Sequence, residues 1–302
     1  MAVNFRERQV ANRRKTLVLL GMMASLTAVV VWAVGVYMGY ASAGIVPIAI
    51  GISVAGVWWS FYASDRIVLR MTGARVVDEN SAPQLYNIVH EVVIASGMPM
   101  PKVAIVDDEA PNAFATGRDP EHAVIAFTTG ILRVMDREQL QGVAAHEMAH
   151  VANRDTLVSA VAATTAGAIA LLSDMLMRIM WFGGGRRDDR GGGSNPFMLI
   201  AALVVMILAP LAAALLRSAV SRSRESLADA TGVEFTRNPA GLRRALETLQ
   251  QDSTVVRQKS HAVAHVWIES PLDASSVNKL FATHPPLTER IAILRQMESG
   301  GS

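Results

Sequence analysis

Residues 142–155 read GVAAHEMAHVANRD, and this stretch decides what kind of protein the chain can be. His146 and His150 stand four positions apart, so a helix places both imidazoles on one face, one turn from each other. Glu147 projects about 100° away from His146, where it can reach a water molecule beside a metal that the histidines share. The alternative is an amphipathic helix whose histidines are satisfied by ordinary packing. The pattern alone leaves both interpretations open.

The composition indicates a protein with a large membrane part. Hydrophobic residues make up 51% of the 302, and the mean hydropathy is +0.29, which is high for a soluble chain. The net charge of +2 gives no basis for nucleic-acid binding. The chain contains no cysteine, so a metal site must take its ligands from histidine, aspartate or glutamate.

Long uncharged runs predict four transmembrane helices, because about 20 apolar residues are needed to cross a bilayer. The runs are residues 17–38, 44–64, 156–173 and 197–216. Asp174 and Arg178 follow the third run, so it is open whether residues 156–182 cross the bilayer or only dip into it. A cleaved signal peptide is the alternative for the first run, but a second span follows it directly. A Gly-rich loop at 183–195 joins the last two runs.

The basic residues near these runs predict the orientation of the protein in a cell (inner) membrane that it crosses several times. Lys and Arg cluster ahead of the first run and after the second and fourth, whereas the turn at 38–44 has none. The Gly-rich loop carries three arginines, partly offset by two aspartates. By the positive-inside rule, both termini and residues 65–155 face the cytoplasm.

The segments around the histidine motif predict a small α+β domain. Residues 81–97 have the caps of an amphipathic helix, with Ser81 at its start and Gly97 at its end. Residues 102–108 and 122–128 are short and β-branched, which is typical of strands.

The segment NAFATG, residues 112–117, lies between those two strands. It is predicted either as a short edge strand, whose free backbone groups can pair with an extended peptide, or as a turn followed by core residues. The edge-strand alternative gives the candidate substrate-binding residues Asn112, Ala113, Phe114, Ala115 and Thr116.

The helix that carries the histidines has a clear start signal. Asp136 and Gln139 form a capping-box pattern. Leu140, Val143 and Val151 then follow at helical spacing, so the motif lies inside the helix and not at its end.

A catalytic zinc site needs a third protein ligand and an open position for water. Asn153 and Thr156 stand where a three-histidine motif requires glycine and histidine, so that type of site is excluded. No glutamate lies between Glu147 and Glu225, which makes Glu225 the first available carboxylate of that kind. Asp229 follows one turn later and is suited to orient His146, because zinc-bound imidazoles usually donate to a carboxylate. A solvated helix with charges four residues apart is the alternative.

These motifs together resemble the HtpX-type integral-membrane zinc metalloendopeptidases, relatives of the CaaX prenyl endopeptidases in the gluzincin group. The resemblance rests on HEMAH (146–150), NAFATG (112–117), SRSRESLAD (221–229) and FATHPPLTERI (281–291), and it covers nearly the whole chain. It implies one Zn²⁺ per chain, held by His146, His150 and Glu225, with Glu147 as the general base. It also implies protein substrates, the NAFATG segment as the edge that holds their backbone, and a role in quality control of membrane proteins, including under stress.

Two further residues are candidates for supporting roles. His284 is a candidate oxyanion donor, because related enzymes place a histidine from this region near the reacting carbonyl; capping of the Pro285–Pro286 turn is the alternative. Asn153 lies about one turn past His150 and either positions it or caps the helix end. His261 and His265 repeat the four-residue spacing without the intervening glutamate, and we interpret them as structural or solvent-exposed.

The predicted architecture is therefore a mainly α membrane protein with an α+β zinc-metalloprotease domain divided by a membrane insertion. Its parts are a basic N-terminal segment (1–16), a transmembrane hairpin (17–64), the first part of the catalytic domain with HExxH (65–155), a second hairpin (156–217) and the second part of the domain with the third ligand (218–302).

The rival hypotheses are a catalytically silent scaffold, a metal transporter or metal-storage protein, and a prenyl-protein endopeptidase. The intact histidine–glutamate set argues against the first, the shortage of polar residues in the spans against the second, and the small number of spans against the third. The sequence leaves the oligomeric state, the cleavage-site preference and the regulation open.

Overall fold

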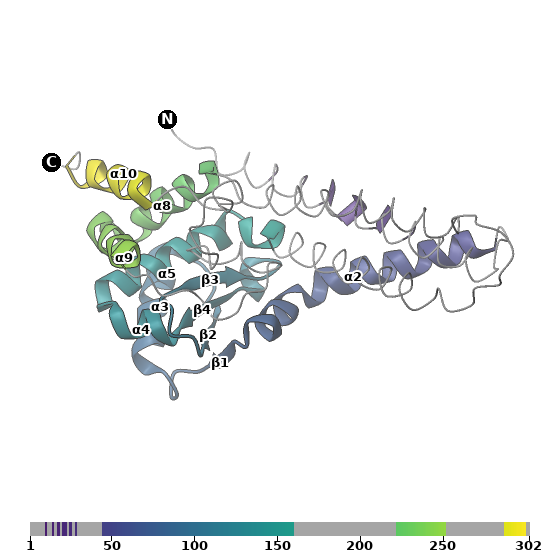
Figure 1. Ribbon diagram of the computed structural model, residues 1–302, viewed down its shortest axis with the longest axis horizontal. Coiled ribbons are helices and arrows are strands. Elements are labelled where there is room, and N and C mark those ends of the chain that lie inside the picture. Colours follow the sequence, from purple (N-terminus) through teal and green to yellow (C-terminus); the bar gives the residue numbers. More distant parts are fainter. Residues whose placement is uncertain are drawn as a thin grey trace, which may run out of the picture.

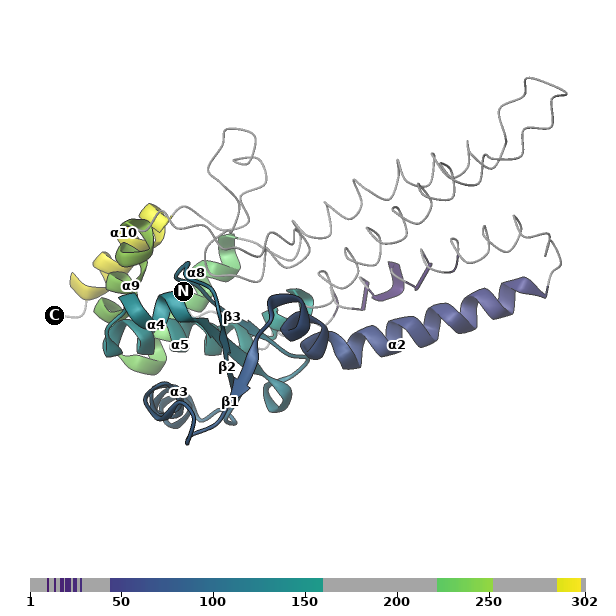
Figure 2. The same cartoon turned by 60° about the horizontal axis from the view of Figure 1, so that its bottom comes forward.

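The computed structural model of the chain describes residues 44–159, 222–251 and 287–299, with scattered residues between Val10 and Ala28. Within those ranges a mixed α/β domain carries one long projecting helix (Figures 1 and 2). The helices are α2 (Ile45–Thr72), α3 (Pro83–Ser96), α4 (Thr129–Val134), α5 (Arg137–Ala152), α8 (Arg222–Thr236), α9 (Pro239–Gln251) and α10 (Leu287–Ser299). The strands are β1 (Arg75–Val77), β2 (Lys102–Val106), β3 (Ala113–Thr116) and β4 (Val124–Thr128), with a short 3-10 turn, η1 (Pro120–His122), before β4.

The four strands form one mixed sheet in the order β1-β2-β4-β3. Strands β2 and β4 are parallel, whereas β1 pairs antiparallel with β2, and β3 pairs antiparallel with β4. The segment Ala113–Thr116 is therefore an edge strand, and the interpretation of residues 112–117 as a turn is wrong. Among the described residues no strand pairs with the outer side of β3.

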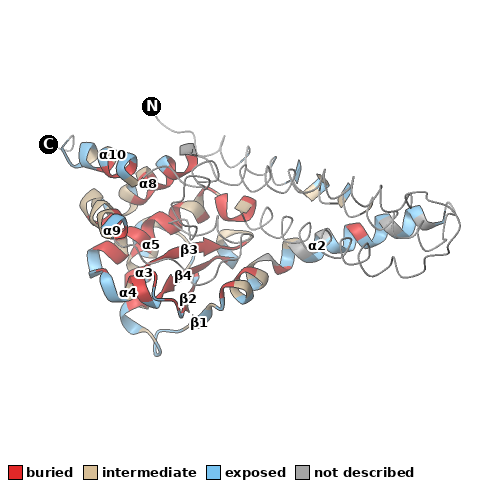
Figure 3. Ribbon diagram, in the orientation of Figure 1, coloured by how far each residue is buried: buried red, intermediate tan, exposed pale blue. Residues whose placement is uncertain are grey.

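The two faces of the sheet are covered by different parts of the chain, because alternate residues of each strand point to opposite faces. Val103, Ile125 and Phe127 belong to the main core with α3 and α5, and that core continues into α9 and α10. Phe114 and its same-face neighbours on β2 and β4 pack instead against Val68, near the end of α2. The α/β domain thus has α5 buried between the sheet and the C-terminal helices, as the burial colours in Figure 3 show.

The predicted helix at 81–97 is present as α3, but its start differs in detail. Ala82 is the N-cap, and no side chain caps it. Ser81 was expected at this position; instead its hydroxyl donates to Asp78 Oδ1 at 2.6 Å and accepts from the Asp78 backbone N–H at 3.0 Å. A local turn has therefore taken the side chain that the helix start would use. Gly97 ends the helix in the left-handed conformation, as the sequence predicts.

Helix α2 contains the second predicted span. Its window Val46–Ala63 has a mean hydropathy of 1.5 and is 7% buried, and it is the one described helix long and apolar enough to cross a membrane. The helix does not end with that window but continues without a break to Thr72, where Val68 is fully buried against the sheet. The apolar window and the α/β domain therefore share one continuous helix.

The other predicted spans are not tested by the described residues. In the run 17–38 scattered positions are helical, and of the run 156–173 residues 156–159 are helical. The run 197–216, the Gly-rich loop 183–195 and the remaining parts of the first and third runs lie outside the described residues. The number of membrane crossings stays a prediction.

Helix α5 packs against α9 at very short range, and Gly142 makes this possible. A Cβ atom at position 142 would lie 2.6 Å from the backbone N and 2.8 Å from the Cα of Leu242. The obstacle is main chain, so a side-chain rotation cannot relieve the clash, and α9 would have to move away from α5.

We expect Gly142→Ala to destabilise the protein by about 1–3 kcal/mol, because the extra methyl group overpacks the α5–α9 contact. Thermal unfolding of the purified protein in detergent measures the effect as a fall in Tm of several degrees. Gly56→Ala is the matched control, since within the described part of the chain no heavy atom lies within 4 Å of a Cβ built there on α2. Equal Tm values for Gly142→Ala and the parent would show that this close approach is absent.

Candidate metal centre

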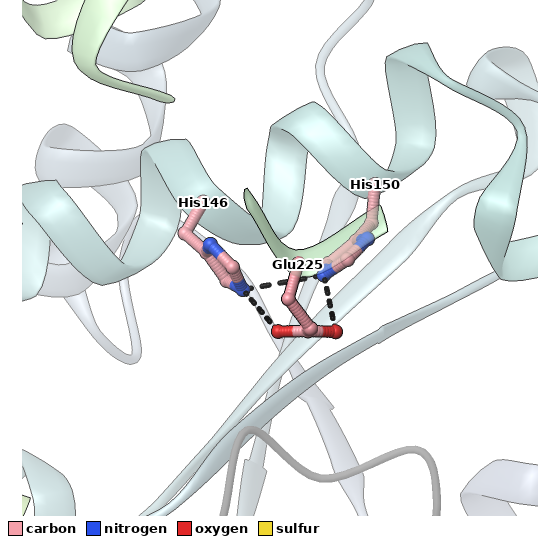
Figure 4. Close-up of side chains that lie close together, drawn as sticks. All are labelled: His146, His150 and Glu225. Atoms are coloured by element: carbon pink, nitrogen blue, oxygen red, sulfur yellow. Dashed lines mark hydrogen bonds and ion pairs between the residues drawn. The ribbon is translucent and has the colours of Figure 1, made fainter. Parts of the chain in front are cut away.

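Three side chains converge on one point, although the two helices that carry them are far apart in the sequence. His146 and His150 come from α5, and Glu225 comes from α8 (Figure 4). The two Nε2 atoms are 3.2 Å apart, and each lies 3.6 Å from one oxygen of the Glu225 carboxylate. All three ligand atoms lie within 4.8 Å of one another. Residues that are far apart in the sequence therefore form one compact donor set.

The donor set fits zinc. In a tetrahedral site with Zn–N bonds of about 2.0–2.1 Å, neighbouring ligand atoms stand about 3.3 Å apart. The separations of 3.2 and 3.6 Å between these imidazole and carboxylate atoms lie close to that value. Two histidines and one glutamate are also the ligands of catalytic zinc sites that leave a fourth position open.

The capping box fixes the start of α5, the helix that carries both histidines. Asp136 Oδ1 accepts from the Gln139 N–H, and Gln139 Oε1 accepts from the Asp136 N–H, both at 2.9 Å.

The crossing of α5 and α8 brings Glu225 to the histidines. Helix α8 crosses α5 at Gly232, where an added Cβ would lie 3.0 Å from the backbone N of His146. A larger residue at 232 would push α8 away from α5 and widen the gap across the donor set.

Each histidine has an aspartate behind it. His146 Nδ1 lies 2.9 Å from Asp229 Oδ1, which is the arrangement expected from the sequence. His150 Nδ1 lies 3.2 Å from Asp155 Oδ2. Hydrogen bonds of this kind fix the tautomer and the direction of a ligating imidazole. Asn153 was a candidate partner of His150, but it is the C-cap of α5, and its backbone N–H donates to the Ala149 carbonyl at 2.9 Å.

Each aspartate in turn has an arginine. Arg290 of α10 donates from Nε and Nη2 to the two oxygens of Asp229, at 2.9 and 2.6 Å, and its Nη1 lies 3.3 Å from Glu225 Oε2. Arg224 Nη1 lies 3.8 Å from Asp155 Oδ1. Three separate segments of the chain thus supply the groups that hold the two imidazoles.

The buried charges around the donor set favour a divalent cation. Six ionic side chains are nearly inaccessible to solvent: the carboxylates Glu147, Asp155, Glu225 and Asp229, and the guanidinium groups Arg224 and Arg290. Four carboxylates against two guanidinium groups leave two negative charges when the imidazoles are neutral. Buried charge of this size is costly unless it is compensated. One divalent cation such as Zn²⁺ would supply the compensation.

Without a metal, protons take over part of this role. Burial and the Arg290 charge disfavour a charged His146, but its contacts with Asp229 and Glu225 outweigh them and raise its pKa to about 9. Burial would raise the pKa of Asp229, but the Arg290 charge and the contact with His146 lower it to about 2. The pKa of Arg290 is raised, against its burial, by Asp229, Glu225 and Glu147. Arg290 therefore stays charged inside the protein.

Glu147 and the side chains of the edge strand β3 are all buried. Glu147 follows His146 on α5, is 3% exposed, and its charge acts on Arg290. The side chains of Ala113, Phe114, Ala115 and Thr116 are buried, so a peptide added to β3 would meet its backbone.

Asn112 stands directly before β3. It accepts from the Thr128 N–H through its carbonyl at 2.9 Å, and its side-chain oxygen accepts from the Ala113 N–H at 3.0 Å. His284, His261 and His265 lie outside the described residues.

Three residues near the centre were not predicted: Asp155, Arg224 and Arg290. Asp155 lies five positions after His150, beyond the end of α5, where helical spacing does not apply. Arg154 has a φ of 59°, so the chain turns sharply and brings Asp155 back to the histidine. Arg290 lies in FATHPPLTERI, where the sequence shows only an arginine beside a glutamate at the start of an apolar pattern, and nothing in it marks the arginine as buried.

The comparisons with known proteins agree with this geometry. The profile of Peptidase family M48 matches residues 79–298. A "Protease HtpX homolog" from Streptococcus gordonii is 44% identical over 294 residues, which cover 96% of this chain and 99% of the relative. One from Syntrophobacter fumaroxidans is 44% identical over 291 residues, covering 95% and 99%.

The fold is also similar to that of a solved structure. Ste24p of S. mikatae matches with a TM-score of 0.52 at 17% identity, over 95% of this chain. The match spans 66% of the Ste24p chain, and at this identity the likeness shows a shared fold alone. It supports a shared fold of helices with a small mixed sheet.

The pKa of His146 predicts how the metal-free protein responds to pH. Because the folded-state pKa of about 9 lies above the ordinary value of 6.5, protonated His146 stabilises the fold below pH 6.5, and this contribution is lost as the pH rises to 9. Zinc must displace the same proton, so its affinity rises about tenfold per pH unit in this window.

Chemical denaturation of the chelated protein and zinc titrations, both between pH 6 and 9, measure these two trends. In Asp229→Asn the imidazole loses its anionic partner, so both pH dependences should weaken. A zinc affinity that stays flat across the window in the parent would contradict the assigned protonation of His146.

Proposed function

The chain belongs to peptidase family M48, and from this premise we propose that it cleaves peptide bonds of membrane or unfolded proteins with one zinc ion per chain. The protein is a metalloprotease of the membrane. The observation that carries the proposal is the convergence of His146, His150 and Glu225 within 4.8 Å. This donor set lies in a domain that shares the continuous helix α2 with a membrane-spanning window.

In this proposal His146, His150 and Glu225 hold the zinc, which when bound supplies a Lewis acid that polarises the scissile carbonyl and makes water more acidic. Glu147 acts as the general base: it accepts a proton from the attacking water and passes it to the leaving amine. Its place on α5, next to a ligand but about 100° around the helix, suits a group that acts beside the metal.

The second layer of residues keeps the imidazoles in place during this chemistry. Asp229 and Asp155 each contact the Nδ1 atom of one histidine and leave Nε2 directed at the donor set. Despite the burial of Asp229, Arg290 lowers the pKa of this carboxyl and so holds it ionised, and Arg224 lies beside Asp155. The two aspartates and the two arginines are all buried, which restricts the movement of the imidazoles that they contact.

The edge strand β3 is the proposed substrate platform. A peptide in extended conformation would pair with its outer side and so extend the sheet by one strand. Binding of this kind depends on main-chain hydrogen bonds and is tolerant of side-chain sequence. Such tolerance suits an enzyme that acts on many misfolded proteins.

Two donors are proposed for the oxyanion that forms at the scissile carbonyl. His284 is the first, since it lies six residues before Arg290, which reaches the centre. The side chain of Asn112, at the start of β3, is the second. One such donor typically contributes about 2.7–4 kcal/mol to transition-state stabilisation.

The location proposed for the site is the cytoplasmic face of the cell membrane. Lys and Arg lie on the same side of the apolar runs as the catalytic domain, which is the side that stays in the cytoplasm. Substrates would be membrane proteins and their cytoplasmic loops, in protein quality control. Four membrane spans and both termini in the cytoplasm belong to the same proposal.

We expect Glu147→Gln to keep one zinc per chain and to cleave casein at least 100-fold more slowly, because the ligands remain and the base is lost. Glu225→Ala should lose the zinc itself, measured by metal analysis after dialysis. Glu234→Gln, an exposed change on α8, is the matched control and should behave as the parent in both assays. Cleavage by Glu147→Gln at the parental rate would refute the assigned base.

Strand addition predicts that single backbone N-methyl groups in a peptide substrate have alternating effects. Methylation removes a donor only where the N–H points to β3, so every second position near the scissile bond should raise KM at least tenfold, and its neighbours should not. Steady-state kinetics on a set of singly methylated peptides tests this. A uniform small effect at all positions would exclude pairing with a strand.

A further inference from the structure

Helix α2 carries a stripe of aromatic and basic residues at the end of its apolar window. Trp59, Tyr62, Arg66 and Arg70 fall within an arc of about 80° around the helix, because each residue advances about 100°. The two aromatic side chains are exposed to 70% and 45%, and both arginines are exposed. Among the described residues no carboxylate lies within ion-pair distance of Arg66 or Arg70. The stripe is therefore an uncompensated basic surface.

The height of this stripe along the helix matches the headgroup layer of a bilayer. The apolar window ends at Ala63, and with a rise of about 1.5 Å per residue Arg66 stands about 4.5 Å beyond it. The headgroup layer is about 5–7 Å thick on each side. Arg70 stands about 10 Å beyond the window, and its long side chain can reach back to the same layer.

A third arginine reaches this position from another element. The Arg118 guanidinium carbon lies 5.2 Å from the centroid of the Tyr62 ring, which is a cation–π contact. Arg118 follows directly after β3 through Gly117, whose φ of 135° and lack of room for a Cβ fix the chain there. The basic surface is therefore built from two rigid parts of the fold and not from one flexible tail.

The nearby acidic groups do not cancel this charge. Asp119 Oδ2 lies 3.4 Å from Arg118 Nε, but the same carboxylate also accepts from the backbone N–H of His122 and contacts its ring. Asp65 lies about 100° around α2 from the centre of the stripe. Three guanidinium groups thus lie near this end of the apolar window, and of these only Arg118 has a carboxylate partner among the described residues.

We propose that Arg66, Arg70 and Arg118, with Trp59 and Tyr62, bind the phosphate of an anionic phospholipid headgroup. Guanidinium groups match the geometry of phosphate oxygens, and Trp and Tyr side chains favour the same layer. The alternative is that the arginines only orient α2 in the membrane, for which the two arginines of α2 would be sufficient. Arg118, which lies over the Tyr62 ring, adds a basic group from the α/β domain that this alternative does not require. The bound lipid holds the end of β3 at the membrane surface. The proposal does not depend on proteolysis.

The test is native mass spectrometry of the full chain in detergent, titrated with phosphatidylglycerol or phosphatidylcholine. The parent should bind phosphatidylglycerol at least tenfold more tightly. Arg66→Gln with Arg70→Gln should remove most of this preference, and Arg118→Gln should weaken it several-fold. The matched control, Arg133→Gln with Arg237→Gln, changes two exposed arginines on α4 and after α8 and should keep the parental preference.

Three outcomes would overturn the proposal. Equal binding of both lipids by the parent excludes an anionic site, and an equal loss in the control variant reduces the effect to net charge. Displacement of phosphatidylglycerol by millimolar inorganic phosphate would assign the site to a soluble anion instead. Equal Tm values of all variants, measured in parallel, exclude unfolding as the cause of any loss.

Discussion

Charge compensation in a buried place is the constraint on which this structure depends. The donor set requires carboxylates where there is almost no water, and each of them must find a cation. Two arginines meet part of the demand, and the remaining negative charge matches one divalent ion. Because the arginines come from α8 and α10, the metal centre forms only when the second half of the domain has docked on α5. Folding of the domain and completion of the site are therefore the same event.

The same buried ion pairs explain how an insertion can separate the two halves of the site. Asp155 opens the helical segment that leads into the inserted residues, and Arg224 and Glu225 stand where the chain has returned. The contact between Asp155 and Arg224 thus joins the entrance to the exit, and both ends also touch the donor set. An insertion of any length is tolerated if its ends are fixed together, since closing a longer loop costs only slightly more entropy.

Local rules were sufficient to predict much of this protein. The capping box of Asp136 and Gln139 and the shared face of His146 and His150 follow from cap chemistry and periodicity. The strands predicted at 102–108 and 122–128 are present but shorter, at 102–106 and 124–128. Glu225 followed from elimination together with family resemblance. Arg290, Arg224 and Asp155 could not follow from local rules, because an arginine beside an acidic cluster is typical of a solvated face until the tertiary contact is known. The prediction of Ser81 as the N-cap of α3 was wrong for a local reason, because its hydroxyl forms hydrogen bonds with Asp78 instead of capping the helix.

The continuity of α2 has a consequence for how such an enzyme selects its substrates. One helix contributes both the membrane window and Val68, which packs on the same face of the sheet as Phe114 of β3. In the proposed membrane placement, the height of β3 above the bilayer is set by α2, because this helix continues without a break into the buried core. A rigid spacing of this kind favours peptide segments that emerge close to the membrane, whereas a tethered domain on a flexible linker would sample all heights. Selection by position can thus coexist with binding through the peptide backbone, which reads little of the sequence.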